Sequence, residues 1–273
     1  MTDHSDTMLA SSPLIAETRG RLRILTLNRP DSMNALTPEL HRQLRLAVME
    51  ASEEAKISAV VLTGNGRGFC AGGDIKVAAK RAKTTKETVE ERQERLRDHA
   101  QTTACLHHMP KVTIALVNGA AAGAGLSLAL ACDLRIAVSS ATFKTAYAQI
   151  GLSGDLGISY FLTRLVGPQR ARQLMLFSEK IAADRALELG LIDLIIDKMP
   201  DQIDELEWIK LIATGPSVAL RAIKENLLAS ETESLQAVTD LEAHNAAKCS
   251  RTADVKEAAT SFREKRPPRF TGT

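Results

Sequence analysis

The sequence predicts an α/β fold in which helices cover β-sheets. Short apolar runs of strand length recur at 59–63, 112–117 and 134–138, and segments with helical spacing of apolar residues alternate with them. The 273 residues are 44% hydrophobic and 25% charged, which excludes a disordered or collagen-like chain. Aromatic residues make up only 3%, so we expect a core of Ala, Leu, Ile and Val.

The first half of the chain contains two predicted strands and a helix. Residues 21–28 form a strand that Pro30 ends, because proline has no N–H to donate to a strand ladder. Thr37 begins a helix, since it offers a hydroxyl N-cap and is followed directly by proline. Residues 59–63 form a buried strand that leads into a glycine-rich loop at 64–74. The apolar residues that repeat at helical spacing after Thr37 are Leu40, Leu44, Ala47, Val48 and Ala51.

The rest of the chain continues the alternation of strands and helices. We expect solvated helices over 76–108, strands at 112–117 and 134–138, a helix at 124–132, helices over 157–190 with a turn at Gly167, a strand at 191–196, and helices from 201 that are broken at Gly215. This pattern divides the chain into an α/β core at 14–200 and a helical C-terminal region at 201–273. No linker between them is rich enough in Gly, Pro or Ser to suggest independent domains.

Charge and cysteine content restrict the classes of partner and compartment. The chain has 35 basic and 33 acidic residues, and a net charge of +2 does not argue for nucleic acid. The four cysteines, at 70, 105, 132 and 249, have no metal-ligand spacing, so we expect reduced thiols in a cytoplasmic protein.

Residues 1–13 lack the features of a signal peptide and are expected to form a mobile tail. Residues 112–132 are uncharged, but their Asn, Ser and Gly favour a strand, a turn and a buried helix over a membrane span.

Two glycine-rich turns, at 69–74 and 118–125, each follow a buried strand. Glycine lets a ligand approach the main chain, and the second turn runs into a helix whose first N–H groups are free. Together the turns suit a developing negative charge, although tight turns needed for packing alone are the alternative. A nucleotide-binding turn is disfavoured, because Tyr147 and Tyr160 lack the lysine four residues later that short-chain dehydrogenases require.

Five segments give the sequence a family resemblance. They read LNRPDSMNAL at 27–36, VVLTGNGRGFCAGGDI at 60–75, VNGAAAGAGLSLALACD at 117–133, ADRALELGLID at 183–193 and FREKRPP at 262–268. In order and spacing they resemble the crotonase superfamily, also called the enoyl-CoA hydratase/isomerase family, over about residues 14–270. The resemblance implies a core of repeated ββα units in a spiral, and a helical C-terminal part that forms a trimer or a dimer of trimers.

The resemblance also implies an activity. The family binds an acyl-CoA thioester, as in fatty acid metabolism, and stabilises an enolate in an oxyanion hole. The two backbone N–H donors correspond here to Gly73 and Ala124. Rigid amides directed at a charged oxygen are strong catalysts, worth about 10²–10³ in rate per donor. No metal or redox cofactor is expected, because coenzyme A is part of the substrate.

The coenzyme A site is also inferred from the resemblance. Its expected members lie in two loops and the C-terminal helix: Asn34, Ala35, Leu36, Ala71, Gly72, Asp74 and Ile75, with Arg29 and Lys265 as candidates for the phosphates. For Arg29 and Lys265, ordinary solvated surface cations are the alternative.

The sequence departs from the hydratase pattern at the two glutamates that perform acid–base chemistry. Ser127 and Tyr147 stand at those positions, and neither replaces a carboxylate. A nearby carboxylate, Asp155, lies where some family members carry an aspartate that acts as base or nucleophile. The alternative is that Asp155 caps the helix that begins near Gly157.

We therefore expect an enzyme in which Asp155 is the acid/base group, by isomerase-type proton transfer or by hydration. The alternative is an acyl-CoA-binding protein without catalysis. Tyr147 belongs to the candidate catalytic set, as a hydrogen-bond donor or, as we favour, a wall of the acyl pocket. His107 and His108 are expected at the surface, and Cys70 is expected to serve packing.

Overall fold

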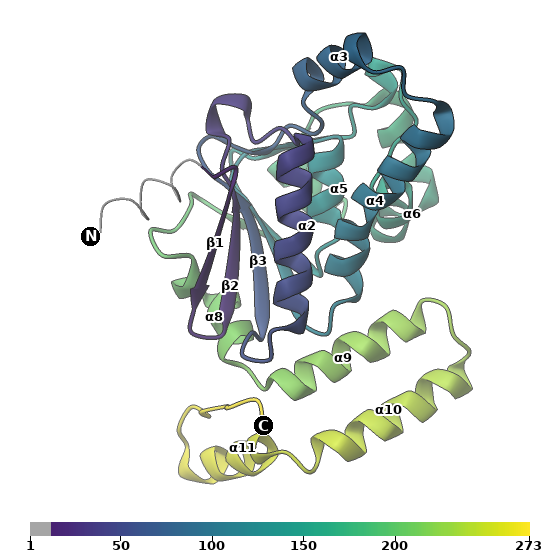
Figure 1. Ribbon diagram of the computed structural model, residues 1–273. Coiled ribbons are helices and arrows are strands. Elements are labelled where there is room, and N and C mark those ends of the chain that lie inside the picture. Colours follow the sequence, from purple (N-terminus) through teal and green to yellow (C-terminus); the bar gives the residue numbers. More distant parts are fainter. Residues whose placement is uncertain (1–11) are drawn as a thin grey trace.

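The computed structural model describes residues 12–273 and confirms the α/β class (Figure 1). The main sheet has the order β1-β2-β3-β5-β7-β10, in which β1 is antiparallel to β2 and all other neighbours are parallel. Its strands are β1 (Leu14–Arg19), β2 (Leu22–Leu27), β3 (Ala59–Gly64), β5 (Val112–Val117), β7 (Leu134–Val138) and β10 (Leu194–Ile196). Of the tail expected at residues 1–13, residues 1–11 lie outside the described part of the chain.

A second, smaller sheet has the order β4-β6-β8-β9. Its strands are β4 (Gly68–Cys70), β6 (Ala120–Ala122), β8 (Thr142–Lys144) and β9 (Ile181–Ala182). Three times along the chain, a strand of the main sheet is followed by a strand of the small sheet and then by helix: β3 and β4, β5 and β6, and β7 and β8. This is the repeated ββα arrangement that the family resemblance implied.

Helices cover both sheets and continue beyond them. The α-helices are α2 (Pro38–Glu53), α3 (Ile75–Thr84), α4 (Val89–His108), α5 (Ala124–Leu130), α6 (Ile158–Phe177), α7 (Ala183–Glu188), α8 (Glu207–Thr214), α9 (Ser217–Ser230), α10 (Leu235–Cys249) and α11 (Ala253–Glu264). Short 3₁₀ turns lie at Pro30–Ser32, Ala148–Ile150 and Ile203–Glu205. In Figure 1, α9, α10 and α11 extend away from the body that carries the sheets.

Successive residues along a strand of the main sheet point alternately into two hydrophobic cores, one on each face of the sheet. In β3, Val60 and Leu62 join the large core beneath α2 and α5, whereas Ala59 and Val61 join a smaller core on the opposite face. Helix α8 covers that second face with the buried side chain of Ile209. Helix α2 begins as predicted, since the Thr37 hydroxyl accepts a hydrogen bond from the Leu40 N–H, and its five predicted apolar residues are all buried. The division of the chain at residues 200 and 201 stays a prediction.

Some elements differ from the sequence expectation. Strand β1 was not predicted, and β10 covers only the last three residues of the strand expected at 191–196. The expected turn at Gly167 is a kink inside α6, where Gly167 has φ 77° and ψ 163°. The uncharged segment 112–132 contains the expected strand and buried helix, β5 and α5, and also the short strand β6, where only a turn was expected. Within residues 12–273, no helix is both long enough and apolar enough to span a membrane.

Candidate active site

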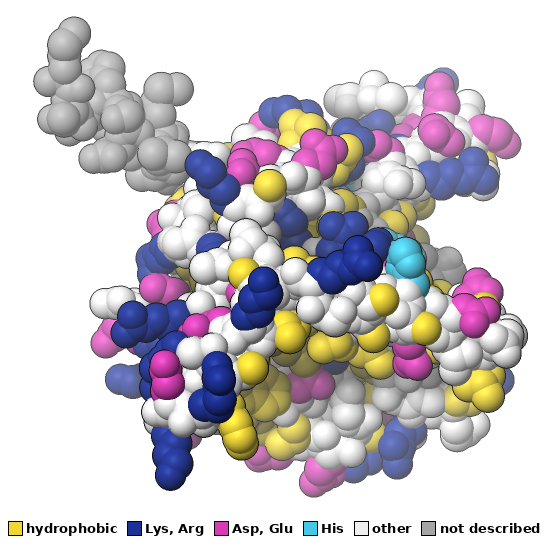
Figure 2. All heavy atoms as spheres, turned by 90° about the horizontal axis from the view of Figure 1, so that it is seen from below, with side chains coloured by type: hydrophobic (Ala, Val, Ile, Leu, Met, Phe, Trp, Pro, Cys, Tyr) yellow, Lys and Arg dark blue, Asp and Glu magenta, His cyan; other side chains and the backbone are white. Residues whose placement is uncertain are grey.

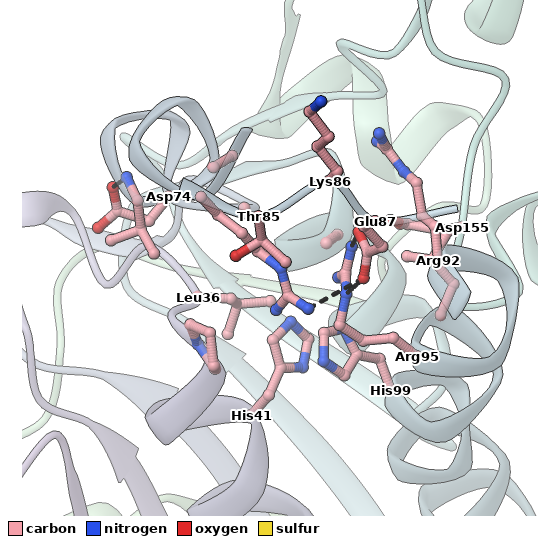
Figure 3. A pocket seen from close by; sticks show the side chains of 17 residues that line it. Leu36, His41, Asp74, Thr85, Lys86, Glu87, Arg92, Arg95, His99 and Asp155 are labelled. Atoms are coloured by element: carbon pink, nitrogen blue, oxygen red, sulfur yellow. Dashed lines mark hydrogen bonds and ion pairs between the residues drawn. The ribbon is translucent and has the colours of Figure 1, made fainter. Parts of the chain in front are cut away.

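A cavity of about 560 Å³ lies between the two glycine-rich turns and helices α2, α3 and α4 (Figure 3). It is lined by Leu36, Pro38, His41, Gly73, Asp74, Val77, Ala78, Arg81, Thr85, Lys86, Glu87, Arg92, Arg95, Leu96, His99, Ala124 and Asp155. Five of these were singled out from the sequence: Leu36, Gly73, Asp74, Ala124 and Asp155. Segments far apart in the chain are thus brought to one cavity.

The two glycine-rich turns touch through their backbones. A Cβ on Gly125, at the start of α5, would lie 2.2 Å from the carbonyl oxygen of Cys70. A Cβ on Gly72, whose φ is +90°, would lie 2.9 Å from the carbonyl oxygen of Ala122. Only glycine permits this approach. The close approach of the two turns brings the backbone N–H groups of Gly73 and Ala124 to the same cavity. Neither N–H donates to a backbone carbonyl oxygen among residues 12–273.

A buried side chain, Asn34, holds the first glycine-rich loop in place. Its oxygen accepts from the Arg29 N–H at 2.8 Å, and its amide donates to the carbonyl oxygens of Asn65 and Gly68 at 2.9 and 2.7 Å. The backbone continues this connection, since the Leu36 N–H donates to the Gly72 oxygen at 2.8 Å. Asn34 is fully buried, so its amide fixes the loop rather than meeting a ligand.

Asp155 is held by a hydroxyl, not by a cation. The Tyr147 hydroxyl donates to Asp155 Oδ1 at 2.6 Å, and the Ser127 hydroxyl lies 3.2 Å from the Tyr147 oxygen. Burial, followed by the charge of Asp155, raises the pKa of Tyr147, so the phenol stays protonated. The second carboxylate oxygen of Asp155 accepts no hydrogen bond from the described residues, and Asp155 lines the cavity.

One expectation and one alternative for this group were wrong. Asp155 does not cap α6, because the N-cap is Gly157 and no side chain caps the helix. Tyr147 is only 4% exposed and is not among the residues that line the cavity, so it is a donor behind Asp155 and not a wall of the pocket. The sequence had placed both residues near the site, but the contact between them depends on the fold of the loop at 145–157.

The other residues expected to hold coenzyme A differ in their accessibility. Ala71 and Ile75 are exposed beside Gly73, whereas Gly72, Ala35 and Leu36 are buried. Arg29 forms a 3.0 Å ion pair with Asp74 and also donates to the Ala35 oxygen.

The two phosphate candidates also differ in place. Lys265 ends α11, outside the residues that line the cavity, and Figure 1 shows α11 at the opposite end of the molecule from α3.

Asp74 caps α3, and although burial acts to raise its pKa, the Val77 N–H and Arg29 outweigh this and lower it.

The cavity also contains polar residues that the sequence analysis missed. The imidazoles of His41 on α2 and His99 on α4 stack with ring centroids 3.9 Å apart (Figure 3). Burial, with the nearby charge of Arg95, lowers the pKa of both. Glu87 is bound by two arginines, Arg81 and Arg95. These residues lie in a charged region with no distinguishing motif, and only the packing of α2 against α4 brings them together.

The remaining candidates lie apart from this chemistry. His107 packs edge-on against Phe161, with ring centroids 5.3 Å apart, and His108 is exposed. Neither lines the cavity. Cys70 is fully buried, and burial raises the pKa of its thiol to about 12, which fits the expected packing role.

Known proteins of one family are similar to this chain. Residues 17–273 match the family described as enoyl-CoA hydratase/isomerase. A Rhodobacter capsulatus protein named "Probable enoyl-CoA hydratase" is 40% identical over 254 residues, covering 92% of this chain and 95% of that protein. The 1,2-epoxyphenylacetyl-CoA isomerase of Escherichia coli is 36% identical over 250 residues, covering 91% and 94%. The enoyl-CoA hydratase structure from Bacillus anthracis has a TM-score of 0.87 at 28% identity, covering 96% of this chain and all of that one.

The neutral His41 makes stability depend on pH. Its pKa is lowered to about 3, mainly by burial, whereas the imidazole titrates near 6.5 in the unfolded chain. Below that value the unfolded state binds a proton that the folded state does not, so stability falls as the pH drops. Between pH 7.5 and pH 5 we expect His41 to contribute a loss of about 2 kcal/mol in the free energy of unfolding.

Urea denaturation at both pH values measures this loss. In His41→Gln the difference between the two pH values should shrink by that amount, whereas His244→Gln, at an exposed position of α10, should keep it. An unchanged difference in His41→Gln would contradict the assignment.

Proposed function

The chain belongs to the enoyl-CoA hydratase/isomerase family, and we propose that it catalyses proton transfer along the acyl chain of an enoyl-CoA thioester. This proposal rests on which carboxylates of the cavity are paired with a cation. Asp74 is paired with Arg29, and Glu87 is paired with two arginines. Among residues 12–273, Asp155 has no cationic partner, so it is the carboxylate available as a base.

In the proposed reaction the thioester oxygen accepts hydrogen bonds from the N–H groups of Gly73 and Ala124. Asp155 removes a proton from the carbon between the thioester and a 3,4 double bond. The electron pair moves into the thioester carbonyl and gives an enolate, whose charged oxygen the two amides stabilise. The protonated Asp155 then returns the proton to the fourth carbon, and the double bond ends between the second and third carbons. One carboxylate thus serves as base and then as acid.

The position of Asp155 supports transfer between two carbons. Tyr147 holds one carboxylate oxygen at 2.6 Å, and the other is left for the substrate. Ser127 and Tyr147 supply no second carboxylate, which water addition by two acids would need. The relative named 1,2-epoxyphenylacetyl-CoA isomerase is consistent with isomerase chemistry on this scaffold.

Addition of water is the second candidate function, because the Rhodobacter capsulatus relative carries a hydratase name. Incubation with a panel of 2-enoyl- and 3-enoyl-CoA esters in deuterated water, followed by mass analysis, separates the two. Deuterium uptake without water addition indicates the isomerase, and a gain of one water indicates the hydratase. Binding with neither change would identify an acyl-CoA-binding protein without catalysis.

For coenzyme A we propose contacts with the backbone of the first loop. Ala71 and Ile75 are exposed on either side of Gly73 and support this assignment. Arg29 reaches the same loop through Asp74. Lys265 stays a phosphate candidate only if another copy of the chain brings it near, because it lies far from the cavity of its own chain. The four free cysteines, of which Cys70 and Cys132 are buried, are compatible with the cytoplasm as the expected compartment.

We expect a trimer or a dimer of trimers. Hydrophobic side chains lie among charged ones on the face that Figure 2 shows. The large hydrophobic residues exposed on α9, α10 and α11 are Ile223, Leu227, Leu235, Val255 and Phe262. Light scattering at micromolar concentration measures the mass, and a monomer would contradict this expectation.

Replacement of the proposed base should remove most activity. We expect Asp155→Asn to lower kcat by about 10²-fold or more, the scale of a positioned acid–base group. Tyr147→Phe should lower it by about 10-fold, because a hydrogen bond to a charged group is worth about 1.5–3 kcal/mol. Ser127→Ala should change little, since its hydroxyl contacts Tyr147 and backbone oxygens only. Initial rates on the best substrate measure all three, and near-normal turnover in Asp155→Asn would refute the role.

The oxyanion hole can be tested at the first residue of α5. Ala124→Gly keeps the N–H and should leave kcat nearly unchanged. Ala124→Pro removes it at a helix position where proline is well tolerated, so folding should survive. The loss of one donor should raise the barrier by about 2.7–4 kcal/mol. Circular dichroism checks the fold of both variants, and equal kcat values would exclude Ala124 from the mechanism.

A further inference from the structure

One wall of the cavity carries an ion cluster centred on Glu87. Glu87, in the connection between α3 and α4, accepts a bidentate pair of hydrogen bonds from Arg95, at 2.9 and 3.0 Å. Arg81 of α3 donates to the same carboxylate at 2.9 Å. Figure 3 shows Glu87 between these dashed contacts, above His41 and His99. Thr88 caps α4 directly after Glu87 and fixes the place of that residue.

The charges on this wall do not balance. Lys86 and Arg92 also line the cavity, so its lining carries four cations against three carboxylates, Asp74, Glu87 and Asp155, and Asp74 is already paired with Arg29. The hydrogen bond from Arg95 and the charges of the nearby arginines lower the pKa of Glu87 to about 2. Glu87 therefore stays ionised and still leaves an excess of positive charge. A second anion placed here would be attracted rather than repelled.

The same wall has hydrogen-bond donors without acceptors. The Nε atom of Arg81 is buried and has no hydrogen-bond partner in the described part of the chain. The imidazoles of His41 and His99 make no hydrogen bond to residues 12–273, and each neutral ring offers one N–H. A straight alkyl chain would leave all of these donors without a partner. A planar carboxylate, which accepts several hydrogen bonds, would satisfy them.

We infer that the acyl group of the substrate ends in a carboxylate, which Arg81 and Arg95 bind and toward which His41 and His99 present their N–H groups. The substrate class is then the ω-carboxyl acyl-CoA thioesters. The inference rests on the proposed function, because it places the acyl group in the cavity whose other lining includes Gly73. In the unliganded chain, Glu87 occupies part of the place of this carboxylate.

Binding of unreactive thioesters tests this assignment without turnover. Dissociation constants are measured by calorimetry for saturated methyl-ended acyl-CoA and ω-carboxyl acyl-CoA of six, eight and ten carbons. The carboxyl form should bind at least about 10-fold more tightly at one chain length or more, as expected of hydrogen bonds to a charged group. The readout is the affinity ratio, which is the dissociation constant of the methyl-ended ligand divided by that of the carboxyl ligand. Because both are measured on the same protein, a loss of folded protein does not change this ratio.

The variants have opposite expected effects on that ratio. Arg81→Gln and Arg95→Gln should each bring the ratio close to one. Glu87→Gln should increase it, because a competing carboxylate is removed while the shape is kept. Arg97→Gln is the matched control on α4, since Arg97 is exposed and, among residues 12–273, pairs only with Glu94. Its ratio should equal that of the wild type.

Equal affinities for both ligands at every chain length would overturn the inference, as would a ratio that Arg81→Gln and Arg95→Gln leave unchanged. Failure of the proposed function looks different. The 3-enoyl forms of the same thioesters would bind but show neither a shifted double bond nor deuterium uptake. Isomerisation of both forms with equal kcat/KM would retain the proposed function and reject the carboxylate.

Discussion

The close approach of two backbone turns determines the rest of the site. Gly72 and Gly125 stand where a Cβ would collide with carbonyl oxygens of the other turn. Because β3 and β5 are parallel neighbours, both turns emerge at the same edge of the main sheet. The amides of Gly73 and Ala124 are thus fixed before any ligand arrives. Donors that need no rearrangement as charge develops are those that lower a barrier most.

The carboxylates of the cavity show how one type of side chain acquires different roles. Arg95 occupies both oxygens of Glu87, so that group is an element of structure or recognition. Asp74 caps α3 and pairs with Arg29, which fixes the first loop. Asp155 receives one hydrogen bond from a phenol, which orients the carboxylate and leaves its charge uncompensated. The hydrogen-bond or ion-pair partner of each carboxylate distinguishes the proposed base, Asp155, from the other two.

The sequence predicted those parts of the fold that local signals encode. The helix that begins after Thr37 was recognised from its cap and apolar spacing, and the long strands from their composition. Strands β4, β6 and β8 have three residues each, too few to show a periodicity. The stacking of His41 on His99 joins two helices and depends on tertiary packing. For Asp155 the sequence left base and cap open, and the start of α6 at Gly157, without a side-chain cap, excluded the cap.

The proposed reaction moves a charge but creates none. When Asp155 takes the proton, its negative charge disappears, and an equal charge develops on the thioester oxygen. A cation bound to Asp155 would stabilise the starting state and oppose this transfer, since close unlike charges attract each other strongly. A neutral phenol opposes it less, and the two amides favour the new position of the charge. Among residues 12–273, the arginines that bind Glu87 form no ion pair with Asp155, which Tyr147 holds, and this arrangement fits the chemistry proposed here.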